Sequence, residues 1–377
     1  MKGIECIELR KFITEYKQKN EKNEFKPVAV GKYGIRTRES IYSKELAKDY
    51  SKNKIIFKNT LTVGMGSRQI DIGILTDDVI YSVSPAYHTY KISGINADYL
   101  RYCLMCRNED MFKRFVKRGS RQGKSIDLKR WLEYEIPVYD VCNQEKIVLK
   151  LNKVTNVISM RKQQLQKLDE LIQARFVEMF GDPRTNPLDF EKQMLKLTCK
   201  VITGNTPSRA VAEYYGNYVE WIKTDNIVAG LLNPTKAVEC LSKKGTEVGR
   251  IVKKDSILMV CIAGSIASIG RVCIVDRTVA FNQQINAVIT GGKYNIIFLY
   301  VLLQISKDYL IEDINMALKG ILSKSKLEKK EFIIPPIELQ NQFADFVNQV
   351  NKSKVEIQQA LEKTQLLFDS LMQQYFG

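Results

Sequence analysis

The chain has 377 residues, 45% of them hydrophobic and 27% charged, with a formal net charge of +16 and a pI near 9.3. This length accommodates two domains of ordinary size, each able to bury a core. No run of about 18 apolar residues predicts a membrane span, and the N-terminus lacks the apolar segment of a signal peptide. Because a large positive excess attracts polyanions, we expect a cytoplasmic protein that binds nucleic acid.

The cysteines favour reduced thiols and argue against a metal site. Eight cysteines are spread along the chain without the spacing of a disulfide framework. Cys103 and Cys106 form a single CxxC pair, and His88 is the one histidine of the sequence. A structural zinc site takes four ligands, so the sequence predicts no metal.

The first segment, 1–142, has the pattern of a mixed α and β domain. Short β-rich runs stand at 54–57 and 69–72, and a helix is predicted near 97–104. Eight basic residues then fall within 18 positions that contain a single acid, Asp127: Lys113, Arg114, Lys117, Arg118, Arg121, Lys124, Lys129 and Arg130. Such density predicts a phosphate-contacting surface, with a merely solvated basic face as the alternative.

A long helix is predicted for 143–182. Residues that alternate in steps of four and three from Ile147 to Met179 are apolar at eight of ten positions, with Arg161 and Arg175 as exceptions. This repeat is the heptad pattern of a coiled-coil seam. The stop signal 181–183, with the sequence Gly-Asp-Pro, ends the pattern.

The second half of the chain repeats this order. The segment 183–338 again has the pattern of a mixed α and β domain, with strands at 218–222 and 272–275 and a helix at 296–306. Its basic group stands at a place that matches the first one: Lys319, Lys324, Lys326, Lys329 and Lys330. The last segment, 339–377, carries a second heptad pattern from Phe343 to Tyr375, again with eight apolar positions of ten.

Short matching phrases support a duplication of the whole unit. The offset is 198 residues for Ile136-Pro137 with Ile334-Pro335 and for Asn143-Gln144 with Asn341-Gln342, and 200 for Phe176 with Phe376. Weaker matches join Gly66-Ser67 to Gly264-Ser265 and Asn96 to Asn295. We therefore expect an α+β protein with two pseudo-repeated mixed α/β domains, separated by two long helices that form an antiparallel coiled coil.

Catalytic motifs are missing from the sequence. The stretch 264–270 has neither the spacing nor the lysine of a phosphate-binding loop. The segments 186–188 and 233–235 both fail the Asn-Pro-Pro-Tyr pattern of base-amino methyltransferases, and nothing matches GxSxG. The sequence therefore predicts a non-catalytic protein without a cofactor, whose partners supply any chemistry.

Several phrases, in a fixed order, carry a resemblance to a known family. They are Tyr81 to Tyr87, the central phrase Leu168 to Pro183, Gly204-Asn205-Thr206-Pro207-Ser208, Tyr218 to Asp225, Ser268 to Arg271, Phe281 to Gln284 and Ile334-Pro335-Pro336. Over essentially its whole length the chain resembles the specificity (S) subunits of type I restriction–modification systems. The first segment departs from the pattern because it lacks a Gly-x-Thr-Pro-Ser opening.

The resemblance implies two target-recognition domains, 1–142 and 183–338, each reading one half of a bipartite double-stranded DNA sequence. It implies spacer helices at 143–182 and 339–377. The implied partners are two modification (methyltransferase) subunits and restriction (translocase/nuclease) subunits. The alternative is a coiled-coil nucleic-acid-binding scaffold without sequence specificity, for which random DNA would yield no enriched gapped site.

Candidate DNA-contacting residues follow from side-chain chemistry. Basic groups neutralise phosphates, Asn and Gln can pair with adenine, and Arg can pair with guanine. In the first domain we expect Arg36, Arg38, Arg68, His88, Lys117, Arg118, Arg121 and Lys124; in the second, Thr206, Ser208, Lys223, Arg271, Asn282, Gln283, Gln284, Lys319 and Lys324. For Gln283 and Gln284 a polar turn is the alternative, and Trp221 is expected in the core.

Overall fold

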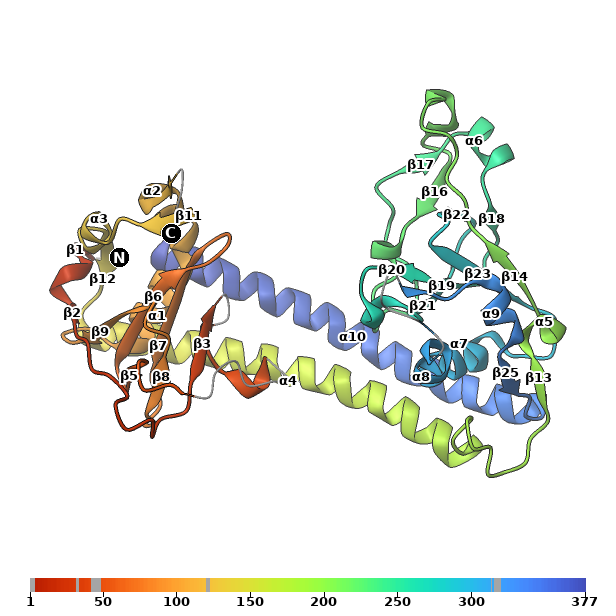
Figure 1. The fold of residues 1–377 in the computed structure, drawn as a ribbon, viewed down its shortest axis with the longest axis horizontal. Coiled ribbons are helices and arrows are strands. Elements are labelled where there is room, and N and C mark those ends of the chain that lie inside the picture. Colours follow the sequence, from red (N-terminus) through yellow and green to blue (C-terminus); the bar gives the residue numbers. More distant parts are fainter. Residues whose placement is uncertain (1–3, 32–33, 42–48, 120–122, 313, 315–319) are drawn as a thin grey trace. The chain divides into compact units, whose positions relative to one another are not determined.

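The computed structural model describes residues 4–31, 34–41, 49–119, 123–312, 314 and 320–377 (Figure 1). Two compact units emerge, one comprising Met1–Arg161 with Gln359–Gly377 and the other Lys162–Gln358. The helices α4 (Val141–Phe180) and α10 (Ile337–Phe376), of 40 residues each, contribute one part to each unit. Within the described ranges, no helix combines the length and the apolar character that a membrane span needs.

Unit 1 is built on a four-stranded antiparallel sheet with the order β2-β9-β6-β7, formed by Ile13–Glu15, His88–Ile92, Thr60–Met65 and Ile70–Leu75. Strand pairs surround it: β1–β12 (Glu5–Glu8, Glu135–Val138), β3–β4 (Val28–Gly31, Gly34–Thr37), β5–β8 (Lys54–Ile56, Tyr81–Val83) and β10–β11 (Val116–Gly119, Gly123–Ile126). The short helices are α1 (Ala97–Cys106), α2 (Asn108–Phe115) and α3 (Leu128–Leu132).

Unit 2 repeats this plan with an antiparallel sheet of order β14-β23-β19-β21, formed by Cys199–Thr203, Ile285–Thr290, Ile257–Val260 and Val272–Ile274. The pair β13–β25 (Lys192–Met194, Glu331–Ile333) corresponds to β1–β12. Helices α7 (Ile296–Ile305), α8 (Lys307–Ile311) and α9 (Lys324–Lys329) stand where unit 1 has α1 to α3. The short helix α5 (Leu195–Thr198) and the pair β20–β24 (Ile262–Ala263, Gly320–Ile321) complete this part.

Unit 2 also has a second sheet. Its order is β15-β17-β16-β22-β18, formed by Tyr215–Gly216, Cys240–Leu241, Val219–Ile222, Val279–Phe281 and Ile251–Val252. The pair β16–β22 is parallel and the other pairs are antiparallel. This sheet and the helix α6 (Lys243–Val248) lie at the end of unit 2 that is away from α10 (Figure 1).

A buried glutamine fastens each domain to its long helix in the same way. Gln144 Nε2 donates to Tyr139 O at 2.7 Å, and its Oε1 accepts from Asn96 N at 2.9 Å. Gln340 repeats both contacts with Pro335 O at 2.7 Å and Asn295 N at 2.9 Å. Asn96 and Asn295 in turn cap the N-termini of α1 and α7. The predicted correspondence of these two asparagines is therefore confirmed.

The structural repeat corrects two of the sequence matches. Gln144 corresponds to Gln340, 196 residues further on, and not to Gln342, which is exposed. The C-terminal ends of the two long helices have the same offset of 196 residues. Phe180 packs against Phe298 of α7, and Phe376 packs in the same way against Tyr99 of α1. The matches at offsets of 198 and 200 residues are wrong because similar phrases recur near the helix ends. Phe-x-x-Met in the first long helix and Phe-x-x-Leu in the second are examples, and each lies within a few residues of the true match. The two heptad patterns, by contrast, already stand 196 apart.

In both units α4 and α10 pack antiparallel through the predicted stripe. In unit 1 the buried Leu151 and Ile158 share a core with Phe368 and Phe376, and in unit 2 Phe176 shares a core with Phe343. All ten stripe positions of each helix are buried or half-buried. The predicted α+β class with paired long helices is therefore confirmed, with early residues of one helix meeting late residues of the other.

The polar stripe residues have partners that explain why they are tolerated. Arg161 donates through Nη1 to Ala360 O, and Thr364 donates to the same carbonyl at 2.7 Å. Lys354, only 16% exposed, places Nζ 2.5 Å from Asp169 Oδ1. A buried cation without a partner would be costly, so these contacts restrict the pairing register of the two helices.

Candidate nucleic-acid interface

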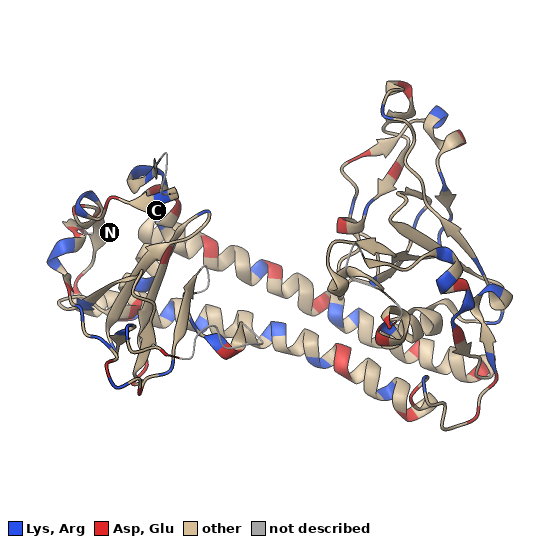
Figure 2. Cartoon of the chain, in the orientation of Figure 1, with Lys and Arg blue, Asp and Glu red and all other residues tan. Residues whose placement is uncertain are grey.

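The basic cluster of the first domain is spread over α2, the hairpin β10–β11 and α3 (Figure 2, Lys and Arg in blue). Lys117 Nζ pairs with Asp127 Oδ2 at 2.7 Å, and Lys124 Nζ donates to Ser67 O at 2.5 Å. The hydrogen bond to Asp127 is the main cause of the lowered pKa of that carboxyl. On α2, Lys113 and Arg114 pair with acids one turn earlier. Part of the charge is thus neutralised locally, whereas the exposed Lys124 contacts only neutral groups in the described structure.

The structure brings three predicted residues of unit 1 toward one end of its sheet. Arg68 is exposed in the β6–β7 turn, next to the Ser67 carbonyl that Lys124 binds. His88 lies opposite Val63 near the same end of β6, and its Nδ1 is 3.3 Å from Glu15 Oε1. This end therefore gathers positive or protonatable groups from three separate segments.

Two other predicted residues of unit 1 lie on β4 and in the 3-10 turn 38–40 that follows it. Arg36 is exposed on β4, and the guanidinium carbon of Arg38 stands 5.3 Å from the Tyr50 ring centroid. Arg118 belongs to β10, but its side chain is not described. Arg121 and, in the second domain, Lys319 lie outside the described residues.

In unit 2 the loop after β14, residues 204–208, is tied to the neighbouring strands. Gly204 passes so close to β22 that an added Cβ would stand 2.2 Å from Asn282 O, which excludes any larger residue without a shift. Asn205 holds Val248 O and Arg250 N at 2.8 Å each. Thr206, exposed as Ser208 is, donates to the Gln283 side chain.

The three amides of the 282–284 turn take different positions. Asn282 is only 6% exposed, and its side chain bonds Gln284 through Nδ2–Oε1 at 3.1 Å and Oδ1–N at 3.1 Å. Gln284 is half-buried, whereas Gln283 is exposed beside Thr206. The polar-turn alternative thus describes Gln284, whose side chain and backbone N–H both bond Asn282, whereas Gln283 presents its amide at the surface and stays a prediction for DNA contact.

Lys223 belongs to a cluster whose other charged members, Arg209 and Glu239, were not predicted from the sequence. Its Nζ binds the Glu239 carboxylate and stands 5.1 Å from the ring centroid of Trp221, which is buried in the core as expected. Arg209 reaches the same carboxylate, with 2.6 Å between Nη2 and Oε2. Arg209 and Glu239 were missed, although Arg209 directly follows the Gly-x-Thr-Pro-Ser phrase.

Arg271 and Lys324 occupy separate places. Arg271 Nε donates to Ser268 O at 3.2 Å and lines a cavity of about 270 Å³ between the long helices and α7. Lys324 is exposed at the start of α9, with its Nζ 3.5 Å from Glu328 Oε1. Among the residues that the structure describes, no group of three or more His, Cys, Asp or Glu could hold a metal ion.

Comparison with known proteins identifies the family. The family model described as "Type I restriction modification DNA specificity domain" matches residues 7–170 and 187–366. The chain belongs to this family. Its function is therefore that of a DNA sequence-specificity subunit, and members of the family are non-catalytic subunits of type I restriction–modification systems.

Solved structures show the same fold. The S subunit of a type I restriction–modification system from M. genitalium is 12% identical, with a TM-score of 0.58 over 99% of this chain and 96% of that one. A structure described as the basis of complex assembly and conformational transition of the type I R–M system is 14% identical. Its TM-score is 0.55 over 100% of this chain and 98% of that one. At these identities the likeness establishes the fold of a specificity subunit and does not identify the DNA-contacting residues.

Proposed function

We propose that this specificity subunit reads a bipartite DNA target, with one half-site for each recognition domain, and directs its partner subunits there. The observation that carries the proposal is the repeat of sheet, helices and glutamine anchor, since each unit has the same plan on its part of the long helices. Two similar domains with different loops suit two different half-sites. The proposed domains are 1–142 and 183–338, with spacer helices 143–182 and 339–377.

The proposed partners are those of a type I system. One similar structure comes from work on complex assembly of such a system, which supports docking with modification and restriction subunits. Two similar units offer two places for a modification subunit, so we infer two copies per chain, acting in the cytoplasm on double-stranded DNA. The bound partners, and not this chain, supply methyl transfer and cleavage.

Methylation mapping tests this proposal. The chain is co-expressed with its modification subunit in a host without endogenous methylation, and methylated positions are mapped over the genome. We expect methylation at a single gapped sequence, and none when either protein is expressed alone. Methylation without sequence preference would contradict the proposal and favour a nonspecific nucleic-acid scaffold.

A further inference from the structure

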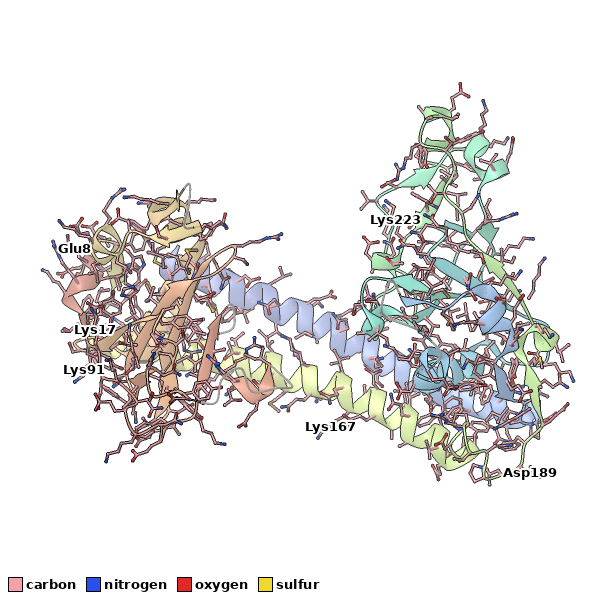
Figure 3. All side chains as sticks on the ribbon, in the orientation of Figure 1. Glu8, Lys17, Lys91, Lys167, Asp189 and Lys223 are labelled. Atoms are coloured by element: carbon pink, nitrogen blue, oxygen red, sulfur yellow. The ribbon has the colours of Figure 1, made fainter. Side chains whose placement is uncertain are left out.

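Five side chains of unit 2 form a cluster, the Arg209 cluster, at the sheet that contains β16 and β17: Arg209, Tyr215, Trp221, Lys223 and Glu239 (Figure 3, where Lys223 is labelled). The guanidinium carbon of Arg209 lies 4.6 Å from the Tyr215 ring centroid and 5.4 Å from that of Trp221. Glu239 binds both cations, Arg209 from one side and Lys223 from the other. The trio of charged groups has a net charge of +1.

The aromatic platform under Arg209 is held rigidly by the preceding loop. Trp221 Nε1 donates to Asn205 O at 3.3 Å, and Tyr215 OH donates to Pro207 O at 2.6 Å. The two rings meet edge to face, with centroids 6.0 Å apart. A guanidinium stacked on such a platform loses little further conformational freedom when it binds a planar partner.

Arg277 of the same unit forms an ion pair with Glu220 and provides a comparison for Arg209. Arg277 gives both Nε and Nη2 to Glu220 at 2.9 Å, and its side chain is 33% exposed. Arg209 is 58% exposed, and in the described structure its guanidinium makes one hydrogen bond, through Nη2. The remaining N–H donors of Arg209 therefore have no hydrogen-bond acceptor among the described residues.

The surroundings fit the edge of a base pair better than a phosphate. A carboxylate is repelled by phosphates, so Glu239 argues against a site that only neutralises the DNA backbone. Val238, next to it, is 99% exposed, and the exposed Thr206 and Ser208 precede Arg209 in the same loop. Polar and apolar groups thus stand together around one oriented guanidinium.

We infer that Arg209 reads a guanine of the half-site bound by the second domain, through two hydrogen bonds to O6 and N7 in the major groove, with Glu239 as its positioning residue. The inference rests on the proposed function of this domain and assigns its base contact. Lys223 shares the Glu239 carboxylate and keeps the cluster positive toward DNA.

The test uses the full chain with its modification subunit and maps methylated sites for Arg209→Gln. Because glutamine pairs with adenine, one guanine of the second half-site should become adenine or lose its preference by about tenfold or more, while the first half-site stays unchanged. Arg277→Gln is the matched control and should leave both half-sites unaltered. Arg209→Lys, which keeps the charge without the planar fork, should also relax that position and serves if the glutamine variant fails to fold.

Two further outcomes separate the possible failures. An unchanged second half-site in a folded Arg209 variant would overturn the inference while leaving the bipartite function intact. A wild-type chain that directs no gapped methylation would overturn the proposed function itself. The Glu239→Gln variant should bind non-target DNA more tightly and discriminate less between target and non-target sequences, because Arg209 and Lys223 lose the anion that they share. If both its affinity for non-target DNA and its discrimination equal those of the wild type, Glu239 has no positioning role.

Discussion

At the scale of single residues, buried amide side chains attach each domain to its long helix, and ion pairs add to the stability of the domains. Gln340 is fully buried and makes three hydrogen bonds, to Pro335 O, Lys293 O and Asn295 N. Water cannot replace these partners, so loss of the side chain leaves buried polar groups unsatisfied. The same logic applies to Gln144 in the first domain.

Gln340→Ala should therefore destabilise the second domain by roughly 1–3 kcal/mol, the cost of leaving buried polar groups without partners. The measurement is thermal or urea unfolding followed by circular dichroism. Gln342→Ala, at an exposed position of the same helix, is the control and should change stability by less than about 0.5 kcal/mol. Equal effects of the two variants would show that the buried amide of Gln340 contributes no more to stability than an exposed one.

The Glu220–Arg277 pair makes stability depend on pH. The hydrogen bond from Arg277 is the main reason why the pKa of Glu220 falls below its usual value of 4.5. A carboxyl with a lowered folded-state pKa stabilises the fold above its unfolded pKa and loses that contribution as pH falls through the folded value. The melting temperature of the wild type should therefore drop more steeply below pH 4.5 than that of Glu220→Gln. Parallel pH profiles for the two proteins would show that the pair adds no net stability.

At the scale of elements, the β10–β11 hairpin is the clearest candidate for phosphate contact. Lys117 and Lys124 project from paired strands, and Arg118 stands opposite Lys124 in the register. The pairing of Lys117 with Asp127 lowers the charge that the hairpin offers to DNA. Lys124 and the neighbouring basic residues of the hairpin therefore stay the prediction for phosphate contact.

Neutralising Lys117, Arg118 and Arg121 to Gln should weaken binding to all DNA sequences alike. Each lost phosphate contact should reduce the slope of log affinity against log salt by about 0.9. The measurement is fluorescence anisotropy of labelled duplexes over a salt series.

The control for this experiment is Lys146→Gln with Lys150→Gln, two exposed lysines of α4 in the same unit. These changes remove charge away from the hairpin and should leave the slope nearly as in the wild type. If the hairpin variant folds and keeps the wild-type slope, the basic cluster only solvates a surface.

At the scale of the whole molecule, the long helices α4 and α10 each contribute one part to both compact units. We propose that α4 and α10 act as a ruler between the two recognition domains. Half-sites read from one face of DNA would then lie about one helical turn, or 10 bp, apart from centre to centre. Changing the helix length should change the gap and leave the half-site sequences alone.

Insertion of four residues after Val157, with four more after Lys363 to keep the antiparallel register, adds about 6 Å of helix. Because a base-pair step is about 3.4 Å, the unspecified gap should lengthen by one or two base pairs. Methylation mapping reads the gap directly. Four-residue alanine replacements at the same places, without a change in length, should preserve it. A fixed gap in a lengthened chain that still binds would refute the ruler.

The duplication, the two heptad helices and the family could all be predicted from the amino-acid sequence. These features are periodic or local: a coiled-coil stripe follows from residue spacing, and the match of Asn96 with Asn295 is a short phrase that recurs in both halves. The absence of catalytic motifs also pointed to the non-catalytic family that the comparison identified.

Features that depend on contacts between distant segments could not be predicted from the sequence. The 196-residue register required the contacts of Gln144 and Gln340, because similar letters recur near the true match. Asn282 looks like its neighbour Gln283 in sequence, yet one side chain is buried in a turn and the other is exposed. Arg209 and Glu239 stand 30 residues apart and meet only through the folding of the sheet, since no local pattern encodes which cation a carboxylate will orient.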